Sequence, residues 1–553
     1  MLWPLALHAG TFHVSERGKD DGPGTADAPW KTLQHAADAI QPGDTVVVEP
    51  GVYDGFELTA GGKPGARMRF LARPGVIVDR GPEHGSRDNI NIEGASHVDI
   101  EGFEVTSAWR AGIRAAECQH VHIRGNHVHD NGRWGIFTGF CDDLVIEDNI
   151  ASGARREHGI YVSNSPKRPV IRGNRIFGNR QAGIHLNGDA SMGREGMVID
   201  PLVENNLIYG NGVRGGAGIN CDGCRGARFR NNILYDNHAN GITLYKIDAS
   251  APSTNNVVVH NTIWMSSRSR WCIRIVDGSV NNTFANNICL TDHATHGAID
   301  IDEPSLRGFA SENNALVERF TTTDGTATLP MTGWRKKTGQ DRRSIAAQAV
   351  ELFVDPDRRD LRLKPGSPAL DAGVAKIGLG HDYFGNRRPA GKAADIGAVE
   401  RCEGSACRRV YAHAGPPLTR ASMDAPPAPL PAGSSTAGAT PGATPDATPP
   451  ASPGPATGTA TGPETTPRTD PGATPPAPGE QAPPTGELAG ATEEPARASR
   501  PAARKPGSGC CRSQATADPP APSIALAALV LLLLYRGQRR RATTAASRAR
   551  RRR

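Results

Sequence analysis

Four side chains in the middle of the chain have the chemistry that β-elimination of a uronic-acid polymer requires. A base must take the proton beside the sugar carboxylate, and a cation must neutralise that carboxylate as negative charge develops. Lys246 ends a predicted strand and Arg274 lies in the next repeat of the chain, so we predict that they supply the base and the cation. A lysine beside a second cation loses its proton more easily. His185 or Tyr245 is predicted to transfer the second proton.

Acidic side chains in the same region are predicted to hold a calcium ion that neutralises the carboxylate instead. Ca²⁺ binds carboxylate oxygens, and the predicted ligands are Asp222, Asp300 and Asp302. Polar and aromatic side chains at equivalent positions of neighbouring repeats are predicted to contact the sugar chain. These substrate-binding residues are Tyr161, Asn220, Asp222, Tyr245 and Asp300.

A repeat of about 23 residues positions these side chains. Its mark is a Gly-Ile pair, and the strand that each pair opens alternates aliphatic with mostly polar residues, as in Ile160 to Ser163. A repeat this short has no room for a helix between strands. We therefore predict an all-β fold, a right-handed parallel β-helix. The pairs begin at Gly112, Gly135, Gly159, Gly183, Gly218 and Gly241, with Cys272-Ile273 and Ala298-Ile299 as degenerate copies.

The outward positions of these strands form the candidate cleft. Repeats about 4.8 Å apart place Tyr161 about 19 Å from Arg274, which is enough for several sugar rings. Two insertions, Gly188 to about Asp200 and Lys246 to about Asn256, follow this strand and are predicted to wall the face. A solvated polar face without a ligand is the alternative. The stacked row comprises Arg114, Phe137, Tyr161, His185, Asn220, Thr243, Arg274 and Asp300.

The segment "APWKTLQHAADAIQPGDTVVVEPGVYDG" is predicted to begin the solenoid. Leu33, Ala36 and Ile40 lie on one side of an amphipathic helix, and Thr45 to Val48 form a first strand. A helix at this point caps the open end of the core. The segment resembles the opening of pectate-lyase-like β-helix proteins, and together with the repeats the resemblance covers residues 11–316. It implies a polysaccharide lyase that uses a Lys or Arg base, often with Ca²⁺.

Two other functions stay open. β-helix polygalacturonases pair Asp-Asp with His-Gly one repeat later, and Asp142-Asp143 followed by His158-Gly159 is similar, which would make the protein a glycoside hydrolase. Their companion Asn-x-Asp and Arg-x-Lys motifs do not occur in the neighbouring repeats. The second alternative is a non-catalytic glycan-binding or structural surface solenoid. Convergence of Lys246, Arg274 and His185 on one point is the feature that would favour the lyase, and a structure in which they splay apart would count against it.

Asn and Cys residues at regular offsets predict internal cross-links. The Asn that follows each Gly-Ile strand is predicted to stack at a bend and to satisfy the turn backbone, which is a structural role. Cysteines at equal offsets in adjacent repeats are close enough for a disulfide. The CxxC is predicted to be structural or disulfide-bonded rather than a zinc site, and such pairs suit an oxidising exterior. The candidate pairs are Cys118–Cys141, Cys221–Cys224 and Cys402–Cys407.

The C-terminal part divides into three predicted segments. Residues 317–410 contain "GSPALDAG", "NRRPAG" and "DIGAVE", and resemble the choice-of-anchor Q module that closes β-helix domains upstream of surface anchors. Residues 411–509 are rich in Pro, Thr and Ala, which is typical of a disordered linker. Residues 510–553 contain a double Cys, the apolar run Ile524 to Tyr535 and an Arg-rich tail, and resemble the myxobacterial MYXO-CTERM sorting signal.

These features predict an exported protein held at the cell surface or outer membrane, with membrane contact through the C-terminal apolar segment. Residues 1–10 have no basic n-region and too short an apolar stretch for a complete secretory signal, which leaves a truncated signal or another export route as the two interpretations. The formal net charge is +6, and nine Arg in residues 536–553 account for all of the excess. The basic charge is thus a terminal tail, so we predict a polysaccharide partner and no nucleic acid.

Overall fold

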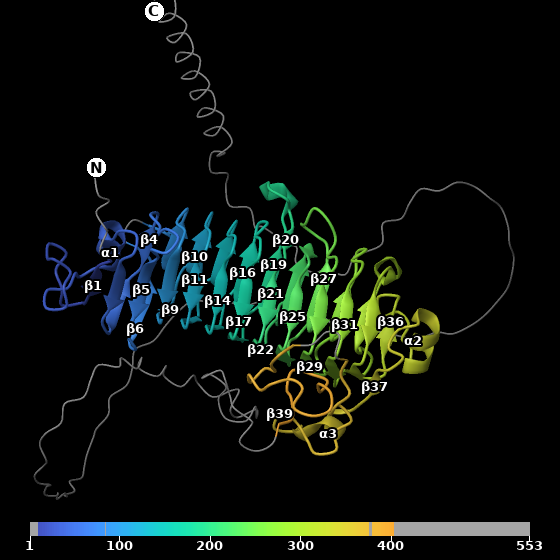
Figure 1. The fold of residues 1–553 in the computed structure, drawn as a ribbon. Helices are drawn as coiled ribbons and strands as arrows, with labels where there is room; N and C mark the ends of the chain where they lie inside the picture. Colours follow the sequence, from blue (N-terminus) through green and yellow to red (C-terminus); the bar gives the residue numbers. More distant parts are fainter. Residues whose placement is uncertain (1–8, 83–84, 375–378, 403–553) are drawn as a thin grey trace, which may run out of the picture. The chain divides into compact units, whose positions relative to one another are not determined.

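The computed structural model describes residues 9–82, 85–374 and 379–402. Strands of these residues stack into three parallel sheets (Figure 1). We name them A, B and C, and their first strands are β1 (Thr11–Val14), β3 (Gly51–Asp54) and β4 (Phe56–Leu58). Each coil of the chain contributes one strand to sheet C, then one to sheet A and then one to sheet B. This confirms the predicted parallel β-solenoid.

Sheet A has twelve strands: β1 (Thr11–Val14), β2 (Thr45–Val48), β5 (Met68–Ala72), β8 (Val98–Glu101), β11 (His122–Arg124), β14 (Val145–Glu147), β17 (Val170–Arg172), β21 (Leu202–Glu204), β25 (Arg228–Arg230), β28 (Val257–Val259), β31 (Thr283–Ala285) and β34 (Ala310–Glu312). Sheet B has twelve: β3 (Gly51–Asp54), β6 (Val76–Arg80), β9 (Glu104–Thr106), β12 (His127–His129), β15 (Ile150–Ser152), β18 (Arg175–Phe177), β22 (Leu207–Tyr209), β26 (Ile233–Tyr235), β29 (Thr262–Met265), β32 (Ile288–Thr291), β35 (Ala315–Leu316) and β37 (Ile345–Ala346). Sheet C has eleven: β4 (Phe56–Leu58), β7 (Ile90–Glu93), β10 (Ala111–Ala116), β13 (Trp134–Gly139), β16 (Ile160–Ser163), β19 (Ile184–Asn187), β23 (Ile219–Asp222), β27 (Ile242–Tyr245), β30 (Ile273–Ile275), β33 (Ile299–Ile301) and β36 (Phe320–Thr321).

The Gly-Ile pairs build sheet C. Their isoleucines stack in register and point inward, so that Ile113, Ile136 and Ile160 are fully buried. The glycine is needed because a core side chain from sheet B packs directly against it. A Cβ on Gly183 would lie 2.6 Å from Ile208 Cγ2, a distance that real Cβ atoms do not reach. Each repeat therefore buries one aliphatic layer and leaves the alternate side chains of sheet C outside.

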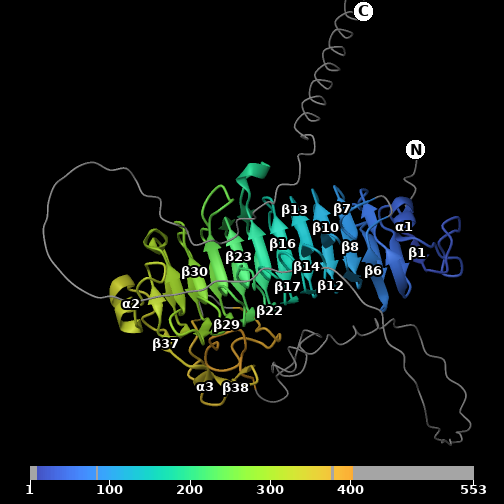
Figure 2. The same cartoon turned by 180° about the vertical axis from the view of Figure 1, so that it is seen from behind.

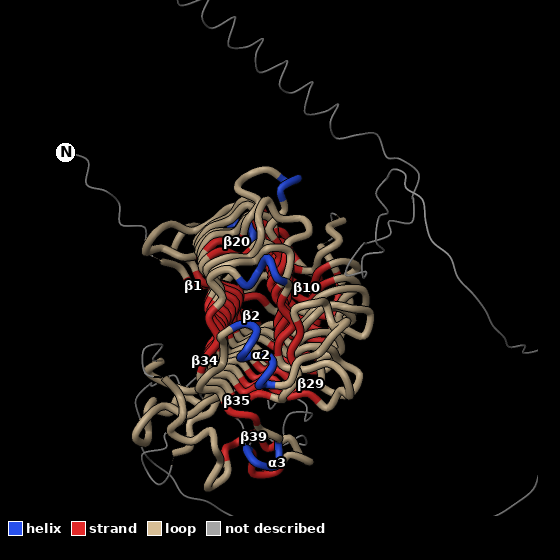
Figure 3. The backbone as a smooth tube through the Cα atoms, turned by 90° about the vertical axis from the view of Figure 1, so that its right-hand side faces the viewer, coloured by secondary structure: helices blue, strands red, loops and turns tan. Residues whose placement is uncertain are grey.

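Helices cover both ends of the core. The predicted N-terminal helix is α1 (Leu33–Ala39), with Leu33 and Ala36 buried in the core and Thr32 as the N-cap. At the other end α2 (Met331–Thr338) places Trp334 against Phe320, with ring centroids 5.1 Å apart (Figures 1 and 3). The predicted β-helix ends at residue 316, but its strands continue to Ala346 in β37. This last part of the solenoid does not contain the Gly-Ile pair.

Two stacks of asparagines hold the coils together. The predicted stack lies between sheets A and B, where from Asn149 onward the Oδ1 accepts hydrogen bonds from the backbone and side-chain N–H of the asparagine in the preceding coil. A second stack, which the sequence analysis did not identify, follows sheet B. The first comprises Asn126, Asn149, Asn174, Asn206, Asn232, Asn261, Asn287 and Asn314, and the second Asn179, Asn211 and Asn237, with Asn131 at the equivalent position two coils before Asn179 and Ala154 between them.

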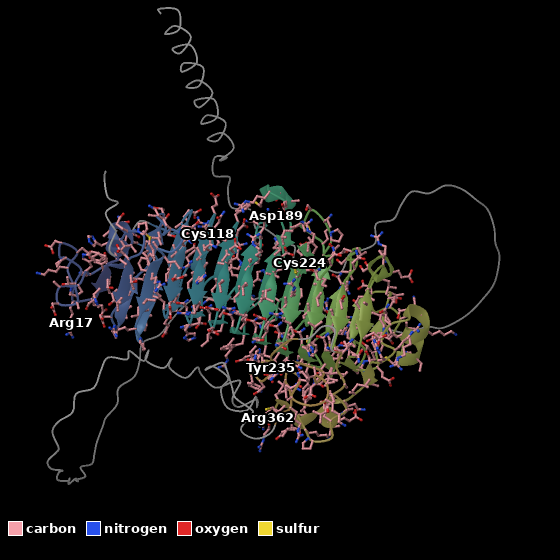
Figure 4. All side chains as sticks on the ribbon, viewed as in Figure 1. Arg17, Cys118, Asp189, Cys224, Tyr235 and Arg362 are labelled. Carbon is pink, nitrogen blue, oxygen red and sulfur yellow. A yellow bond between two sulfur atoms is a disulfide. The ribbon has the colours of Figure 1, made fainter. Side chains whose placement is uncertain are left out.

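Two disulfides occur at predicted positions. Cys118 is bonded to Cys141 in the next coil, with Cα atoms 4.5 Å apart, and Cys221 is bonded to Cys224 (Figure 4). Among the described residues Cys272 and Cys289 are buried free thiols. The predicted Cys402–Cys407 pair extends outside the described residues, because Cys407 is not among them.

The segment after the solenoid folds back onto the outer face of sheet B. It begins with α3 (Ala349–Leu352) and the antiparallel pair β38 (Phe353–Asp355) and β39 (Asp360–Leu363), and it packs on Tyr235 and Trp264 (Figure 2). Arg388 is buried and donates to the carbonyls of Asp395 and Gly397 and to Glu400. These residues come from the segments that resemble choice-of-anchor Q, and their described contacts stabilise this region.

The predicted linker 411–509 and sorting tail 510–553 lie outside the described residues, as do residues 1–8. Within the described ranges, no helix combines the length and the apolar character that a membrane crossing needs.

Candidate functional site

The outer face of sheet C carries the predicted row of side chains in the predicted register. Tyr161 pairs with His185, His185 with Asn220, and further along the sheet Arg274 pairs with Asp300. The first position of the row is Arg114, beside Phe137. The candidate site is therefore one continuous strip, and its members come from successive coils about 4.8 Å apart.

The two insertions form a wall beside this strip. The first contains the 3₁₀ helix η1 (Ala190–Met192) and β20 (Val198–Ile199), which pairs with β24 (Cys224–Arg225). Ala190 N–H donates to Asp248 O at 2.9 Å, which joins the first insertion to the second. In Figures 1 and 4 the first insertion projects from the edge of the solenoid, and Asp189, labelled in Figure 4, lies where its short helix begins.

Asp222 holds the second insertion in place. Its carboxylate accepts hydrogen bonds from the backbone N–H groups of Ile247, Asp248 and Ala249 at 2.9, 2.8 and 3.3 Å. Burial raises the pKa of Asp222 to about 6. We conclude that Asp222 positions the wall rather than facing a sugar or a cation.

Three side chains form a chain of hydrogen bonds on the outer face of sheet C, next to the points where the two insertions leave it. His158 Nδ1 accepts from the backbone N–H of Ala182 at 3.1 Å, so in neutral His158 the proton is on Nε2. His158 Nε2 is 3.0 Å from His185 Nδ1, and His185 Nε2 is 3.2 Å from Tyr245 Oη. The backbone amide thus fixes the direction of the chain, in which His158 donates to His185 and His185 donates to Tyr245.

Aromatic rings extend this group toward the N-terminal coils. Tyr161 stacks on His185 with ring centroids 5.0 Å apart, and Phe137 meets Tyr161 edge to face at 5.5 Å. Asn187 Nδ2 donates to Tyr161 Oη at 3.1 Å, and burial raises the pKa of Tyr161 to about 12. The phenol of Tyr161 is therefore held as a neutral hydrogen-bonding group.

Burial lowers the pKa of His185 to about 3, and this predicts how stability depends on pH. An unfolded histidine binds a proton near pH 6.5, so between about pH 6.5 and 3 the unfolded state holds a proton that the folded state does not. Stability must fall as the pH falls through this window, by about 2 kcal/mol between pH 7 and 5 for this group. We expect the midpoint of thermal unfolding of His185→Gln to depend less on pH than that of the native protein. Equal pH dependence of the two proteins would contradict it.

Arg274 and Asp300 form a separate group, three coils from His185. Arg274 pairs with Asp300 in the next coil and with Asp324 at 2.6 Å. Burial raises the pKa of Asp300 to about 6. At the other end of the strip Arg114 pairs with Glu93, and both arginine side chains remain partly exposed, at 18% and 22%.

The predicted catalytic trio does not converge. His185 and Arg274 are three coils apart, about 14 Å, which exceeds hydrogen-bond reach. Lys246 is exposed, and the cation expected to help deprotonate it, Arg274, is already paired with Asp300. The structure instead brings His185 and Tyr245 together with His158, whose role the sequence analysis missed. A His-Gly pair one repeat before a histidine on the outward row was the available signal.

The predicted calcium ligands do not form a cluster either. Asp222 and Asp300 are three coils apart, about 14 Å, which is too far for two ligands of one ion. Asp302 caps the 3₁₀ helix η2 (Glu303–Leu306), because its Oδ1 accepts from Ser305 N–H at 2.9 Å. The residues predicted to bind calcium therefore do not fit such an ion, and each has a structural partner.

The remaining predicted residues have local partners. Asn220 Oδ1 accepts from the Ala217 N–H at 3.3 Å. Of the carboxylates in the hydrolase alternative, Asp142 accepts from Lys167 N–H at 2.9 Å and Asp143 pairs with Arg168 at 2.7 Å. These contacts place both carboxylates in the turn between sheets C and A.

Comparison with known proteins finds the same type of fold. Residues 12–272 match the family described as Pel9A-like, right handed beta helix region. The chain is 23% identical over 314 residues to pectate lyase PEL9 of Emericella nidulans, covering 48% of this chain and 75% of that protein. It is 24% identical over 440 residues to the uncharacterized protein YwoF of Bacillus subtilis, covering 65% of this chain and 92% of that protein. The crystal structure of pectate lyase Pel9A matches with a TM-score of 0.51 and 16% identity, covering 71% and 96% of the two chains. These findings show a pectate-lyase-like right-handed β-helix.

Proposed function

We propose that the protein cleaves a uronic-acid-containing polysaccharide by β-elimination along the outer face of sheet C. The observation that carries the proposal is the oriented chain His158–His185–Tyr245, which brings a phenol next to the two insertions and lies between two partly exposed arginines. The pectate-lyase-like fold supports the same substrate class, because a related β-helix is named a pectate lyase.

In the proposed reaction a base removes the proton from the carbon beside the sugar carboxylate. The electron pair of that C–H bond forms the carbon–carbon double bond, and the glycosidic C–O bond on the far side breaks. The leaving oxygen takes its proton from Tyr245 Oη, and His185 Nε2–H supports the phenolic oxygen as it loses its proton. Because Lys246, Arg274 and His185 do not meet at one point, the proposal rests on the Tyr245 proton donor and not on that trio. Lys246, which is exposed and follows Tyr245 in the chain, is kept as the base.

The arginines are assigned to substrate carboxylates. Arg114 and Arg274 are each three coils from His185, one on either side, and an anionic polymer that crosses the strip would meet both. A guanidinium binds a carboxylate in a fixed bidentate geometry. Glu93 and Asp300 already orient these guanidinium groups. The arginine side chains therefore lose less conformational entropy when the sugar binds. No step of this mechanism uses Ca²⁺, because the described acidic residues of the strip do not offer a calcium site.

The test is the ultraviolet absorbance of the unsaturated product during incubation of the full chain with a panel of uronic-acid polymers and one neutral polymer. We expect product from at least one acidic polymer and none from the neutral one. Arg114→Gln should raise KM by about 10–100-fold with a smaller change in kcat, since it removes a charged hydrogen bond to substrate.

Product from no polymer, together with retention on an acidic glycan column, would overturn the lyase and favour a glycan-binding solenoid. Reducing ends formed without the unsaturated product would favour the hydrolase.

We also propose that the protein works outside the cytoplasm, anchored at the cell surface by its C-terminal segment. The two disulfides support this location, because such bonds persist in oxidising compartments. The anchor and its membrane contact rest on the sequence of residues 510–553 alone.

A further inference from the structure

A group of metal-ligating side chains lies on sheet B, on a different face from the strip. Glu104 is on β9 and His127 is its neighbour in register on β12. His129, two residues further along β12, points to the same face. Among the described residues, these three are the one group of three or more His, Cys, Asp or Glu whose ligand atoms all lie within 4.8 Å of one another.

Hydrogen bonds orient one of the two histidines for coordination. His129 Nδ1 contacts Asp130 Oδ2 at 2.7 Å, and this leaves Nε2 directed at Glu104 Oε1, 3.3 Å away. Tetrahedral ligands at about 2.05 Å from a metal are about 3.3 Å apart, so this pair is already at coordination spacing. A carboxylate on the far nitrogen is the usual partner of a metal-bound histidine, because it fixes the tautomer and makes the ring more basic.

The position on sheet B also favours a site. Toward the C-terminus the outer face of this sheet is apolar, with Ile233, Tyr235 and Trp264 packed against the C-terminal segment. On β9 and β12 the same face carries Glu104 and the two histidines, which are half-buried and outside that packed cluster. The nearby cation Arg175 is held by Tyr209 Oη at 2.7 Å.

The ring arrangement sets one requirement. The rings of His127 and His129 are stacked with centroids 4.2 Å apart, so coordination by both needs them to tilt toward a common point. Both lie at a partly exposed surface, where side-chain rotation is a small change.

We propose that Glu104, His127 and His129 bind a first-row transition-metal ion of the Zn²⁺ type, with Asp130 as the positioning residue. Two imidazoles and one carboxylate suit Zn²⁺ rather than Ca²⁺, which prefers oxygen ligands. Three protein ligands leave a coordination position for water or for an oxygen of a ligand. This site is independent of the proposed lyase chemistry, because it uses none of the residues of sheet C.

The test is calorimetric titration of the metal-free full chain, without an affinity tag, with ZnCl₂ and in parallel with CaCl₂. We expect one Zn²⁺ equivalent that Glu104→Gln and His129→Gln each weaken by more than 100-fold. Asp130→Asn should weaken it by about 10–100-fold, as expected for loss of the group that orients a ligand. The matched control is His122→Gln on β11 of the same coil, whose ring lies outside the group and should leave the affinity unchanged.

Cobalt supplies a second readout. Co²⁺ bound to these ligands should give visible absorption bands that disappear in His129→Gln and persist in His122→Gln. Circular dichroism of each metal-free variant checks that the fold is intact, and Glu104→Gln, at a residue whose side chain is 39% exposed, keeps the test available if a histidine variant fails to fold. Zn²⁺ affinity that is equal in the native protein, Glu104→Gln and His129→Gln would overturn the proposal, as would equal affinity for Ca²⁺.

Discussion

Tyr245→Phe is expected to lower the rate of eliminative cleavage by about 10²–10⁴-fold, the usual contribution of a positioned proton donor. The substitution removes one oxygen and keeps the ring, which packs at 6% exposure beside the strip. His185 Nε2–H then loses its acceptor, but His158 still fixes the His185 ring through Nδ1. The measurement is kcat from the absorbance of the unsaturated product on the polymer that the native protein cleaves. KM should change little, because the phenol acts on the leaving oxygen.

Two further variants separate proton transfer from packing. His185→Gln should lower kcat less than Tyr245→Phe and should shift its pH profile, since His185 acts through the tyrosine. Tyr53→Phe on β3 is the matched control: it removes a phenol that donates to Glu49 O at 2.7 Å, remote from the strip, and should leave kcat unchanged. If Tyr245→Phe retained native kcat, the proton would have to come from another group and our assignment would be wrong.

The fold could be predicted from the sequence because each coil repeats the same physical constraint. Gly-Ile marks the place where a core side chain packs against the backbone, as Ile208 does against Gly183, and the alternation after it separates core from surface. The final coil was not predicted because it has no Gly-Ile pair. Phe320 stands at the position that an isoleucine takes in the earlier coils. The helix α2 was missed for a related reason: its buried face consists only of Met331 and Trp334, too few apolar positions for a clear helical period.

The candidate site was predicted less well, because sequence register gives the row of a residue but not the direction of its side chain. Tyr245 pairs in register with Asp222 in the preceding coil, yet its ring reaches back across two coils to His185. For the predicted calcium ligands the difficulty is the reverse, since their type suits the ion and their spacing does not. Asp222 and Asp300 are chemically suitable, but the coil spacing separates them. His127-Val128-His129 could not be recognised as a site from the sequence, because its third ligand, Glu104, comes from the preceding coil.

Asn232→Ala is expected to destabilise the solenoid by about 3–5 kcal/mol, the range of a change that leaves several buried polar groups unpaired. Asn232 Oδ1 accepts from the backbone N–H of Asn206 at 3.1 Å and from its Nδ2 at 2.9 Å. Asn232 Nδ2 donates to Val203 O and to Asn261 Oδ1. Alanine removes these bonds in a fully buried corner, where water cannot replace them. Chemical denaturation followed by circular dichroism measures the loss.

Because each coil contacts mainly its neighbours, the damage should also be local. Hydrogen exchange should therefore speed up most at the Asn206 amide and at the coils on either side of it, with less effect near α1. Gln119→Ala is the control, since it removes an amide from an exposed turn and should change stability by less than about 0.5 kcal/mol. Equal losses in the two variants would mean that the asparagine stack contributes no more than surface polarity does, and that close packing of the isoleucine layers holds the coils together.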